Sequence, residues 1–176
     1  LYVQGEDGTG GVLGDNDFWI QGNALIEKAF CTGTGAFVLR ASDMLVDAKG
    51  NVRPGEDAKP QIQYLSAKQI IPHTVKNGSI LEAAFVSENI RQGEKSINIE
   101  VHRLIDGQYV ITNHTYSSQN GTYEEAALPE GIAPVIKTGS DIPWFAVVMP
   151  NVVNNLPGHN GLGISVFANA IDTLKG

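Results

Sequence analysis

Turn-forming dipeptides divide the middle of this 176-residue chain into short runs of strand-forming residues. The dipeptides are Asn77-Gly78, Gln92-Gly93, Asp106-Gly107 and Asn120-Gly121. Asn-Gly and Asp-Gly favour tight hairpin turns, because both residues tolerate a positive φ. Consecutive hairpins predict an antiparallel meander. The expected strands are 70–75, 80–87, 96–105, 108–117 and 123–128.

Side-chain alternation is clearest in the third of these strands. Ile97, Ile99 and Val101 alternate with Asn98, Glu100 and His102. Successive residues of a strand point to opposite faces of the sheet. The pattern therefore predicts that one face packs inward and the other meets solvent or a partner.

A helix is expected before the meander, starting after the capping residues Asp15, Asn16 and Asp17. Apolar residues then recur near helical spacing, and Gly33 and Gly35 end the helix. These apolar residues are Trp19, Ile20, Leu25, Ile26, Ala29 and Phe30. Strands are expected over 37–39, 61–65 and 144–149, with a hairpin around a turn at 48–51.

A second helix is expected at the other end, from Ile164 to Lys175, with Ile164, Phe167, Ile171 and Leu174 on one face. We predict that this apolar face forms a packing or subunit interface. The fold class is α+β: an antiparallel β-sheet meander flanked by an N-terminal and a C-terminal helix. Residues 1–14 are expected to be a flexible lead-in, and 15–176 a single α+β domain.

Composition narrows the function. Apolar residues make up 42% and charged residues 18%, which is typical of a globular domain. The net charge of -7, without a Lys or Arg cluster, argues against tight binding of nucleic acid. No apolar run is long enough to cross a membrane. Because the chain begins at Leu1 without a methionine, we interpret it as an excised or processed fragment.

Motifs for catalysis or cofactor binding are not found. The histidines, His73, His102, His114 and His159, lack metal-ligand spacing, and we interpret them as solvent-facing, although His102 and His114 could face each other across a hairpin. Gly33-Thr34-Gly35 lacks the lysine of a phosphate loop and is interpreted as a helix stop. Cys31 is expected to be a small buried hydrophobe. Two of three glycosylation sequons, at Asn77 and Asn120, are explained as turns; the third is at Asn113. No catalytic residue, metal or cofactor is predicted.

Three stretches, taken in order, resemble the portal proteins of tailed bacteriophages with Gram-positive hosts. Asp15 to Phe37 resembles a helix and glycine-terminated strand start near the beginning of those proteins. Ile62 to Pro72, followed by Gly78 to Val86, is similar to the strand pair that comes next. Gly161 to Leu174 resembles the segment that begins the helix leading to the portal stem. The resemblance covers most of the chain from Asp15 onward, and about a third of a portal subunit.

The resemblance implies a wing-like α+β fragment of a structural protein, not an enzyme. Portal proteins form a ring, a dodecamer when full length, at one capsid vertex. Double-stranded DNA passes through the ring during packaging and ejection without sequence-specific binding. The implied partners are other portal subunits, the capsid protein, the terminase and the head-tail adaptor. The implied location is the virion, with host cytoplasm during assembly and no membrane.

Two other classes of function compete with this one. A β-rich module that binds carbohydrate or protein would fit the sequons, the hairpins and exposed Tyr109, Tyr116 and Tyr123. A hydrolase that uses acidic residues would need convergent carboxylates in a pocket. The adjacent Glu124 and Glu125 would point to opposite faces of a strand, so they do not form such a pair.

Overall fold

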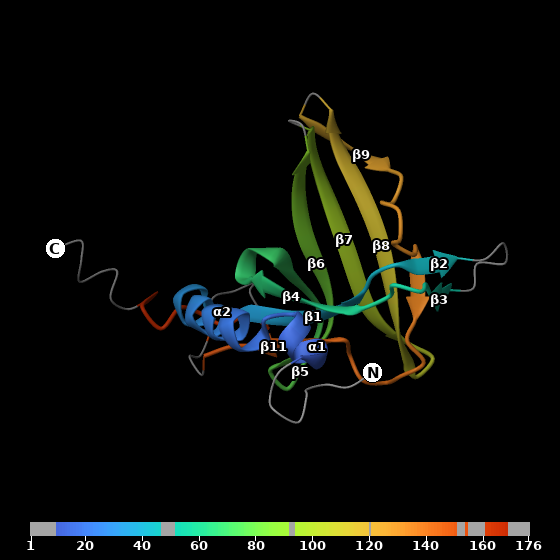
Figure 1. Ribbon diagram of the computed structural model, residues 1–176. Coiled ribbons are helices and arrows are strands. Elements are labelled where there is room, and N and C mark those ends of the chain that lie inside the picture. Colours follow the sequence, from blue (N-terminus) through green and yellow to red (C-terminus); the bar gives the residue numbers. More distant parts are fainter. Residues whose placement is uncertain are drawn as a thin grey trace. The chain divides into compact units, whose positions relative to one another are not determined.

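The computed structural model describes residues 10–46, 52–91, 94–119, 121–150, 154 and 161–168. The fold is α+β, as predicted, and most of its sheet is an antiparallel meander (Figure 1). The described residues form two compact units. Unit 1 is drawn from Leu1–Arg40, Pro60–Ile70 and Trp144–Gly176, and unit 2 from Ala41–Lys59 and Ile71–Pro143. The single domain expected over 15–176 stays a prediction.

Unit 1 combines two helices with a three-stranded sheet. The helices are α1 (Gly11–Asp15) and α2 (Phe18–Thr32), and a short 3-10 helix, η1, spans Ala67–Gln69. The strand order is β11 (Phe145–Val148), β1 (Gly35–Ala41) and β4 (Pro60–Ser66), and β1 and β11 are antiparallel. Leu25 and Ala29 of α2 are buried against Gly35 of β1, so α2 covers the face of β1 that carries Gly35 and Phe37. Ala36 and Val38 are buried on the opposite face of the strand.

Close backbone contacts end α2 and position the chain around it. Gly33 has a φ of 89°, and its N–H donates to the carbonyl of Ala29 at 2.7 Å. This is the glycine stop that the sequence predicts. A Cβ added to Gly33 would overlap the carbonyl oxygen of Gly163, and one added to Gly163 would overlap that of Gly33. The Gly163 N–H also donates to the Thr34 hydroxyl at 2.8 Å, so both glycines are needed for this approach.

Asn16 joins the helices of unit 1 to its sheet. Its side-chain amide donates to the carbonyls of Val12 and Pro60, at 2.8 Å and 3.1 Å. Its side-chain oxygen accepts from the N–H of Ile62 at 2.8 Å. The sequence predicts a helix cap here, but the residue at the N-cap of α2 is Asp17, which makes no side-chain cap hydrogen bond. Asn16 instead completes the start of β4.

Unit 2 is built on a six-stranded antiparallel sheet, in which five strands follow the order β10, β8, β7, β6 and β5 and the sixth, β9, pairs with β8. Figure 1 shows the long hairpins of β6, β7 and β8 side by side. A separate two-stranded pair, β2 with β3, completes the unit. The bounds are β2 Met44–Val46, β3 Val52–Pro54, β5 Ile70–Lys76, β6 Ser79–Arg91, β7 Glu94–Ile105, β8 Gln108–Gln119, β9 Thr122–Ala126 and β10 Val135–Lys137.

The predicted hairpins are confirmed. Asn77 and Gly78 have φ values of 52° and 78°, and Asp106 and Gly107 have values of 50° and 79°. Positive φ at both central residues is the geometry that matches the twist of the flanking strands. The β6–β7 ladder runs to the pair Arg91 and Glu94, and its turn residues lie outside the described residues.

Two expectations about the ends of the chain need correction. Residues 11–14, expected in a flexible lead-in, belong to α1, while 1–9 lie outside the described residues. The helix expected from Ile164 is not present over 164–167, where the chain forms irregular and turn structure. The Val166 N–H donates to the carbonyl of Phe30, and the Ala168 N–H donates to the carbonyl of Ser165 at 3.0 Å, a turn-type bond. Residues 169–176 lie outside the described residues.

We expect Gly163→Ala to destabilise the protein, by about 1–3 kcal/mol, because the new methyl group would overlap the Gly33 carbonyl. The matched control is Gly22→Ala in the interior of α2. There the added Cβ would lie 3.6 Å from the Phe37 ring, an ordinary contact, and alanine favours helix by about 0.5–1 kcal/mol. Urea unfolding of both variants measures the difference. Equal stability of the two variants would refute the importance of the glycine contact.

Candidate interaction surface

The helix α2 presents a second apolar side to solvent. Trp19, Ile26 and Phe30 are 58%, 41% and 46% exposed. Their spacing of seven and four residues places them on one side of a helix. The buried residues Leu25 and Ala29 lie on a neighbouring side, so this helix is apolar over more of its circumference than its own sheet covers.

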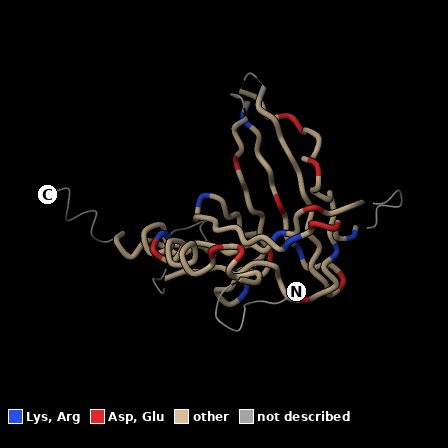
Figure 2. Tube along the Cα trace, in the orientation of Figure 1, with Lys and Arg blue, Asp and Glu red and all other residues tan. Residues whose placement is uncertain are grey.

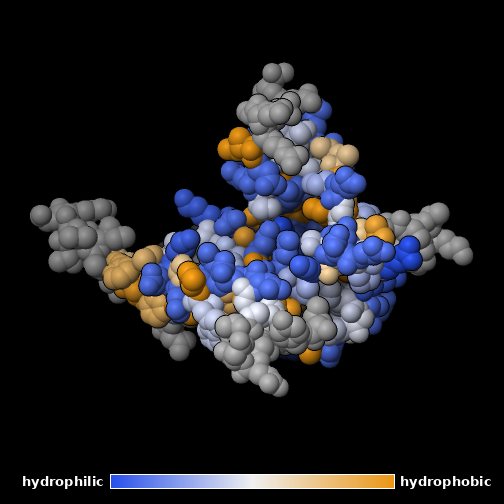
Figure 3. Space-filling view, viewed as in Figure 1, coloured by the Kyte–Doolittle hydropathy of each residue, from blue (hydrophilic) through white to orange (hydrophobic). Residues whose placement is uncertain are grey.

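Residues 161–168 extend this apolar surface. The hydrogen bond from the Val166 N–H to the Phe30 carbonyl, of 3.1 Å, places the segment at the end of α2. Val166 and Phe167 are 38% and 57% exposed. In Figure 3, hydrophobic groups gather over the end of α2 and this segment. We call the set Trp19, Ile26, Phe30, Val166 and Phe167 the α2 stripe. Apolar surface of this kind is typical of protein contact sites.

Two of the four predicted interface residues lie in the described part of the chain. Phe167 is exposed and belongs to the α2 stripe, whereas Ile164 is half-buried. Ile171 and Leu174 lie outside the described residues, so their role stays a prediction. Sequence reasoning missed Trp19 and Phe30 as surface residues, because it assigned every apolar residue of the helix to a single pattern. Steps of 100° per residue, the helical repeat, would have separated the two sides.

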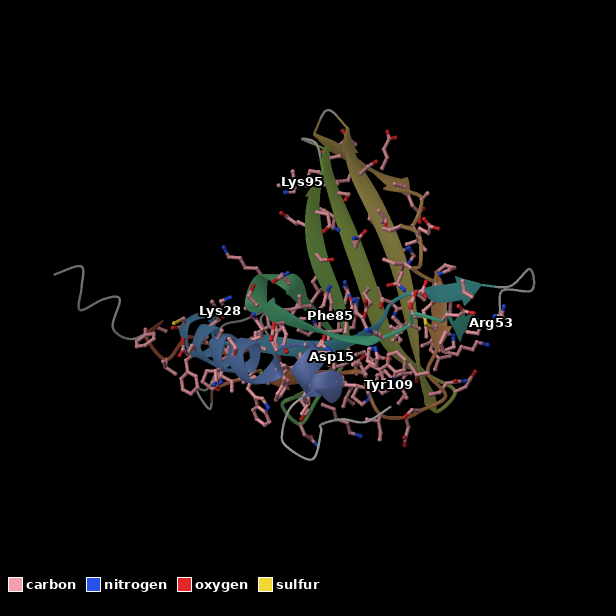
Figure 4. All side chains as sticks on the ribbon, in the orientation of Figure 1. Asp15, Lys28, Arg53, Phe85, Lys95 and Tyr109 are labelled. Carbon is pink, nitrogen blue, oxygen red and sulfur yellow. The ribbon has the colours of Figure 1, made fainter. Side chains whose placement is uncertain are left out.

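In unit 2 the meander buries its polar face. Glu100 and His102 are 5% and 0% exposed, and His102 Nε2 lies 2.5 Å from Glu100 Oε1. The Phe85 ring, labelled in Figure 4, meets the His102 ring edge-on at a centroid distance of 5.2 Å. The prediction that the histidines are solvent-facing is therefore wrong for His102. The two residues are two apart in β7, so they share the face on which Phe85 lies, and their hydrogen bond makes burial tolerable.

The opposite face carries the apolar residues of the alternating pattern and is partly exposed to solvent. Ile97, Ile99 and Val101 are only half-buried. His114 lies on this face, opposite Ile99, and its Nδ1 is 3.6 Å from Glu125 Oε1. His102 pairs with Ile111 instead, so His102 and His114 do not face each other. The strand register places them on opposite faces of the sheet.

The structure confirms some of the predictions made for the other histidines, the cysteine and the sequons, and corrects others. His73 is exposed, as expected, and His159 lies outside the described residues. Cys31 is exposed, so the prediction of a buried thiol is wrong. The residue follows exposed Phe30 and lies on a side of α2 away from buried Leu25. Among the sequons, Asn77 forms the expected turn, and the Asn113 amide donates to the Ala133 carbonyl at 2.8 Å. Asn120 lies outside the described residues.

The tyrosines do not form one exposed set. Tyr109 is buried, which corrects the expectation of exposure, and its hydroxyl donates to the Leu81 carbonyl at 2.6 Å. Burial raises the pKa of this phenol, and the negative charge of Glu82 raises it further. Burial likewise raises the pKa of Tyr64, with a second contribution from Asp17. Tyr116 is half-buried and Tyr123 is exposed, so only one of the three lies fully at the surface.

Glu82 is held as a carboxylate by two hydrogen bonds. The Thr74 hydroxyl donates to its Oε2, and the N–H of Leu104 donates to its Oε1 at 2.9 Å. The pKa of Glu82 is lowered, chiefly by the Thr74 hydrogen bond. A lowered pKa means that the ionised group stabilises the fold above its unfolded pKa, and that this stabilisation is lost as the pH falls through the folded pKa.

We expect Thr74→Val to raise the pKa of Glu82, because the largest cause of its lowering is removed while the shape of the side chain is kept. The stability difference between the variant and the parent should be present at neutral pH and vanish in acid, where Glu82 is protonated in both. NMR titration of the Glu82 carboxyl group measures the pKa. An unchanged titration would contradict the assigned role of Thr74.

The buried pair gives a second prediction. Glu100→Leu alone should cost about 3–5 kcal/mol, because it leaves His102 buried without its carboxylate. The double variant Glu100→Leu with His102→Leu should cost less than either single change, since apolar pairs often replace buried polar pairs at little cost. Denaturant unfolding of the three variants forms a double-mutant cycle. Strictly additive losses would show that the two side chains do not interact.

Some features are absent from the described part of the chain. It holds no group of three or more His, Cys, Asp or Glu residues placed to bind a metal ion. None of its helices has the length and apolar character needed to span a bilayer. Figure 2 shows acidic and basic residues scattered along the described trace, without a long basic stretch. Comparison with protein-family models, curated proteins and solved structures finds no match for this chain.

Proposed function

We propose that this chain is a wing-like part of the portal protein of a tailed bacteriophage. In this role it is a passive structural component and not an enzyme. Its copies contribute to a ring at one capsid vertex, and double-stranded DNA passes through that ring. The proposed partners are other portal subunits, the capsid protein, the terminase and the head-tail adaptor. The proposed location is the virion, reached from the host cytoplasm during assembly.

The observation that carries the proposal is that segments from all three portal-like stretches meet in unit 1. Asn16, in the first stretch, bonds to Ile62 at the start of the second. Thr34 and Phe30, also in the first, accept hydrogen bonds from Gly163 and Val166 in the third. The resemblance to portal proteins rests on the order of these three stretches along the chain. Direct contact between them supports a single inherited unit over three chance likenesses.

The surface of the chain agrees with a role in assembly. A closed ring gives every subunit the same two neighbours, and each contact requires surface that a lone subunit leaves exposed. The α2 stripe is surface of that kind. The net charge of -7 suits a component past which DNA moves, because strong attraction to phosphate would oppose translocation.

Electron microscopy of the full-length protein that contains this sequence tests the proposal. We expect rings with a central channel, made of about a dozen subunits as the portal resemblance implies. A full-length protein that stays monomeric at concentrations where the rings of other portal proteins persist would contradict the proposal. Binding of that monomer to a glycan array would instead favour the carbohydrate-binding alternative.

A further inference from the structure

The outer half of the meander in unit 2 is a four-stranded layer with an open edge on each side. β7 pairs with β6 up to Arg91, and β9 pairs with the last residues of β8. β5 has seven residues and is joined to β6 by the two-residue turn Asn77-Gly78, so it can accompany only the first part of thirteen-residue β6. Among the described strands, none pairs with the outer side of Ser87–Arg91 or of β9.

The two edges lie at the same level of the sheet. The strand registers connect Ser87 through Asn98 and Thr115 to Ala126. They likewise connect Asn89 through Ser96 and Ser117 to Glu124. The five residues of β9 therefore span the same rows as the five residues 87–91 of β6, on the opposite side of the layer. Figure 1 shows β9 and β6 on these two sides.

The strand directions suit addition of a second copy. Each of the three pairings from β6 to β9 is antiparallel, so β9 runs antiparallel to β6. If β9 of one copy lay beside β6 of the next, the junction would be antiparallel too, and the alternation would continue without a break. Main-chain hydrogen bonds across an open edge are a known means of strand addition.

Charge favours unlike edges over like ones. β9 carries Glu124 and Glu125, both exposed, and pairing two β9 edges would bring four carboxylates together. The 87–91 segment carries one acidic and one basic residue, Glu88 and Arg91. It also carries Ile90, which is 73% exposed, the highest value for a large apolar residue among those described. Long open edges with exposed apolar residues are the ones that recruit further strands.

From these observations we infer that β9 of one copy of this chain adds to the 87–91 edge of β6 in the next copy. The contact joins two different surfaces, so it propagates from copy to copy and gives a ring or a filament, not a closed dimer. The inference rests on the sheet edges. The portal proposal adds only the expectation that the series of contacts closes into a ring.

Repulsion between like charges disfavours one register of the contact. If each row of paired residues continued straight into the next copy, Glu125 would lie opposite Glu88 of that copy. Lys95 lies 3.1 Å from Glu88 and offsets its charge. A shift of two residues toward the start of β6 keeps every side chain on its own face and removes that opposition, whereas the opposite shift would carry Thr122 and Tyr123 past Arg91, the last residue of β6. It places Glu124 beside Ser87 and Tyr123 beside Glu88. Closure of a sheet into a ring also requires a stagger between strands.

Disulfide trapping tests this contact. In a Cys31→Ser background, Ser87→Cys with Glu124→Cys reports the shifted register, and Asn89→Cys with Glu124→Cys reports the straight one. Within one copy these positions are separated by three strand spacings, about 14 Å, which is too far for a disulfide. Any bond must therefore join two copies. We expect oxidation of the concentrated 176-residue chain to give a ladder of disulfide-linked species, trimers and larger. The ladder should form faster with the shifted pair of cysteines than with the straight pair.

Three controls define the outcome. Glu124→Cys with Lys137→Cys has two exposed cysteines but none on the β6 edge, and it should give at least tenfold less ladder. Single-cysteine variants should give no species above a dimer. Ile90→Lys added to the shifted pair should reduce the ladder, while an unchanged circular dichroism spectrum shows that the sheet is intact. A ladder from neither edge pair, or from the control pair equally, would overturn the inference. The portal proposal would then still depend on its microscopy test.

Discussion

The close approach of Gly33 and Gly163 is the constraint on which unit 1 depends. The left-handed φ of Gly33 ends α2 and turns the chain directly into β1. The missing side chains let two backbone segments, 130 residues apart in the sequence, come into contact. That contact places Thr34 where it can accept from the Gly163 N–H, and Phe30 where it can accept from Val166. The α2 stripe therefore exists because two glycines allow its two segments to meet.

Features set by neighbouring residues were predictable from the sequence. The Asn77-Gly78 and Asp106-Gly107 turns, the glycine stop of α2 and the strands of the meander all follow from φ preferences and periodicity within a few residues. Features that depend on distant partners were not. The three-residue β10 is a strand only because Ile136 pairs with Ile111, and the short run Val135–Lys137 has no clear period of its own.

The burial of the meander shows the same limit. Period-two alternation correctly separates Ile99 from Glu100, but it does not state which face is covered. The structure covers the face with Glu100 and His102, because these two side chains satisfy each other and Phe85 lies against them. Hydropathy ranks single residues and does not anticipate a hydrogen bond between two of them. Of the α2 stripe, the sequence predicts only Phe167 as an interface residue, because the exposure of Trp19 depends on what α2 lies against.

Both units share an arrangement that their own stability does not explain. Unit 1 leaves Trp19 and Phe30 in water, and unit 2 leaves Ile90 in water while it buries Glu100 and His102. Exposed apolar groups lose stabilisation that burial would give, at roughly 1.5–3 kcal/mol for each large side chain. Sequences depart from local consistency mainly where function requires it. The exposed apolar residues lie at one side of a helix and at one edge of a sheet, which is where the proposed contacts between copies would cover them.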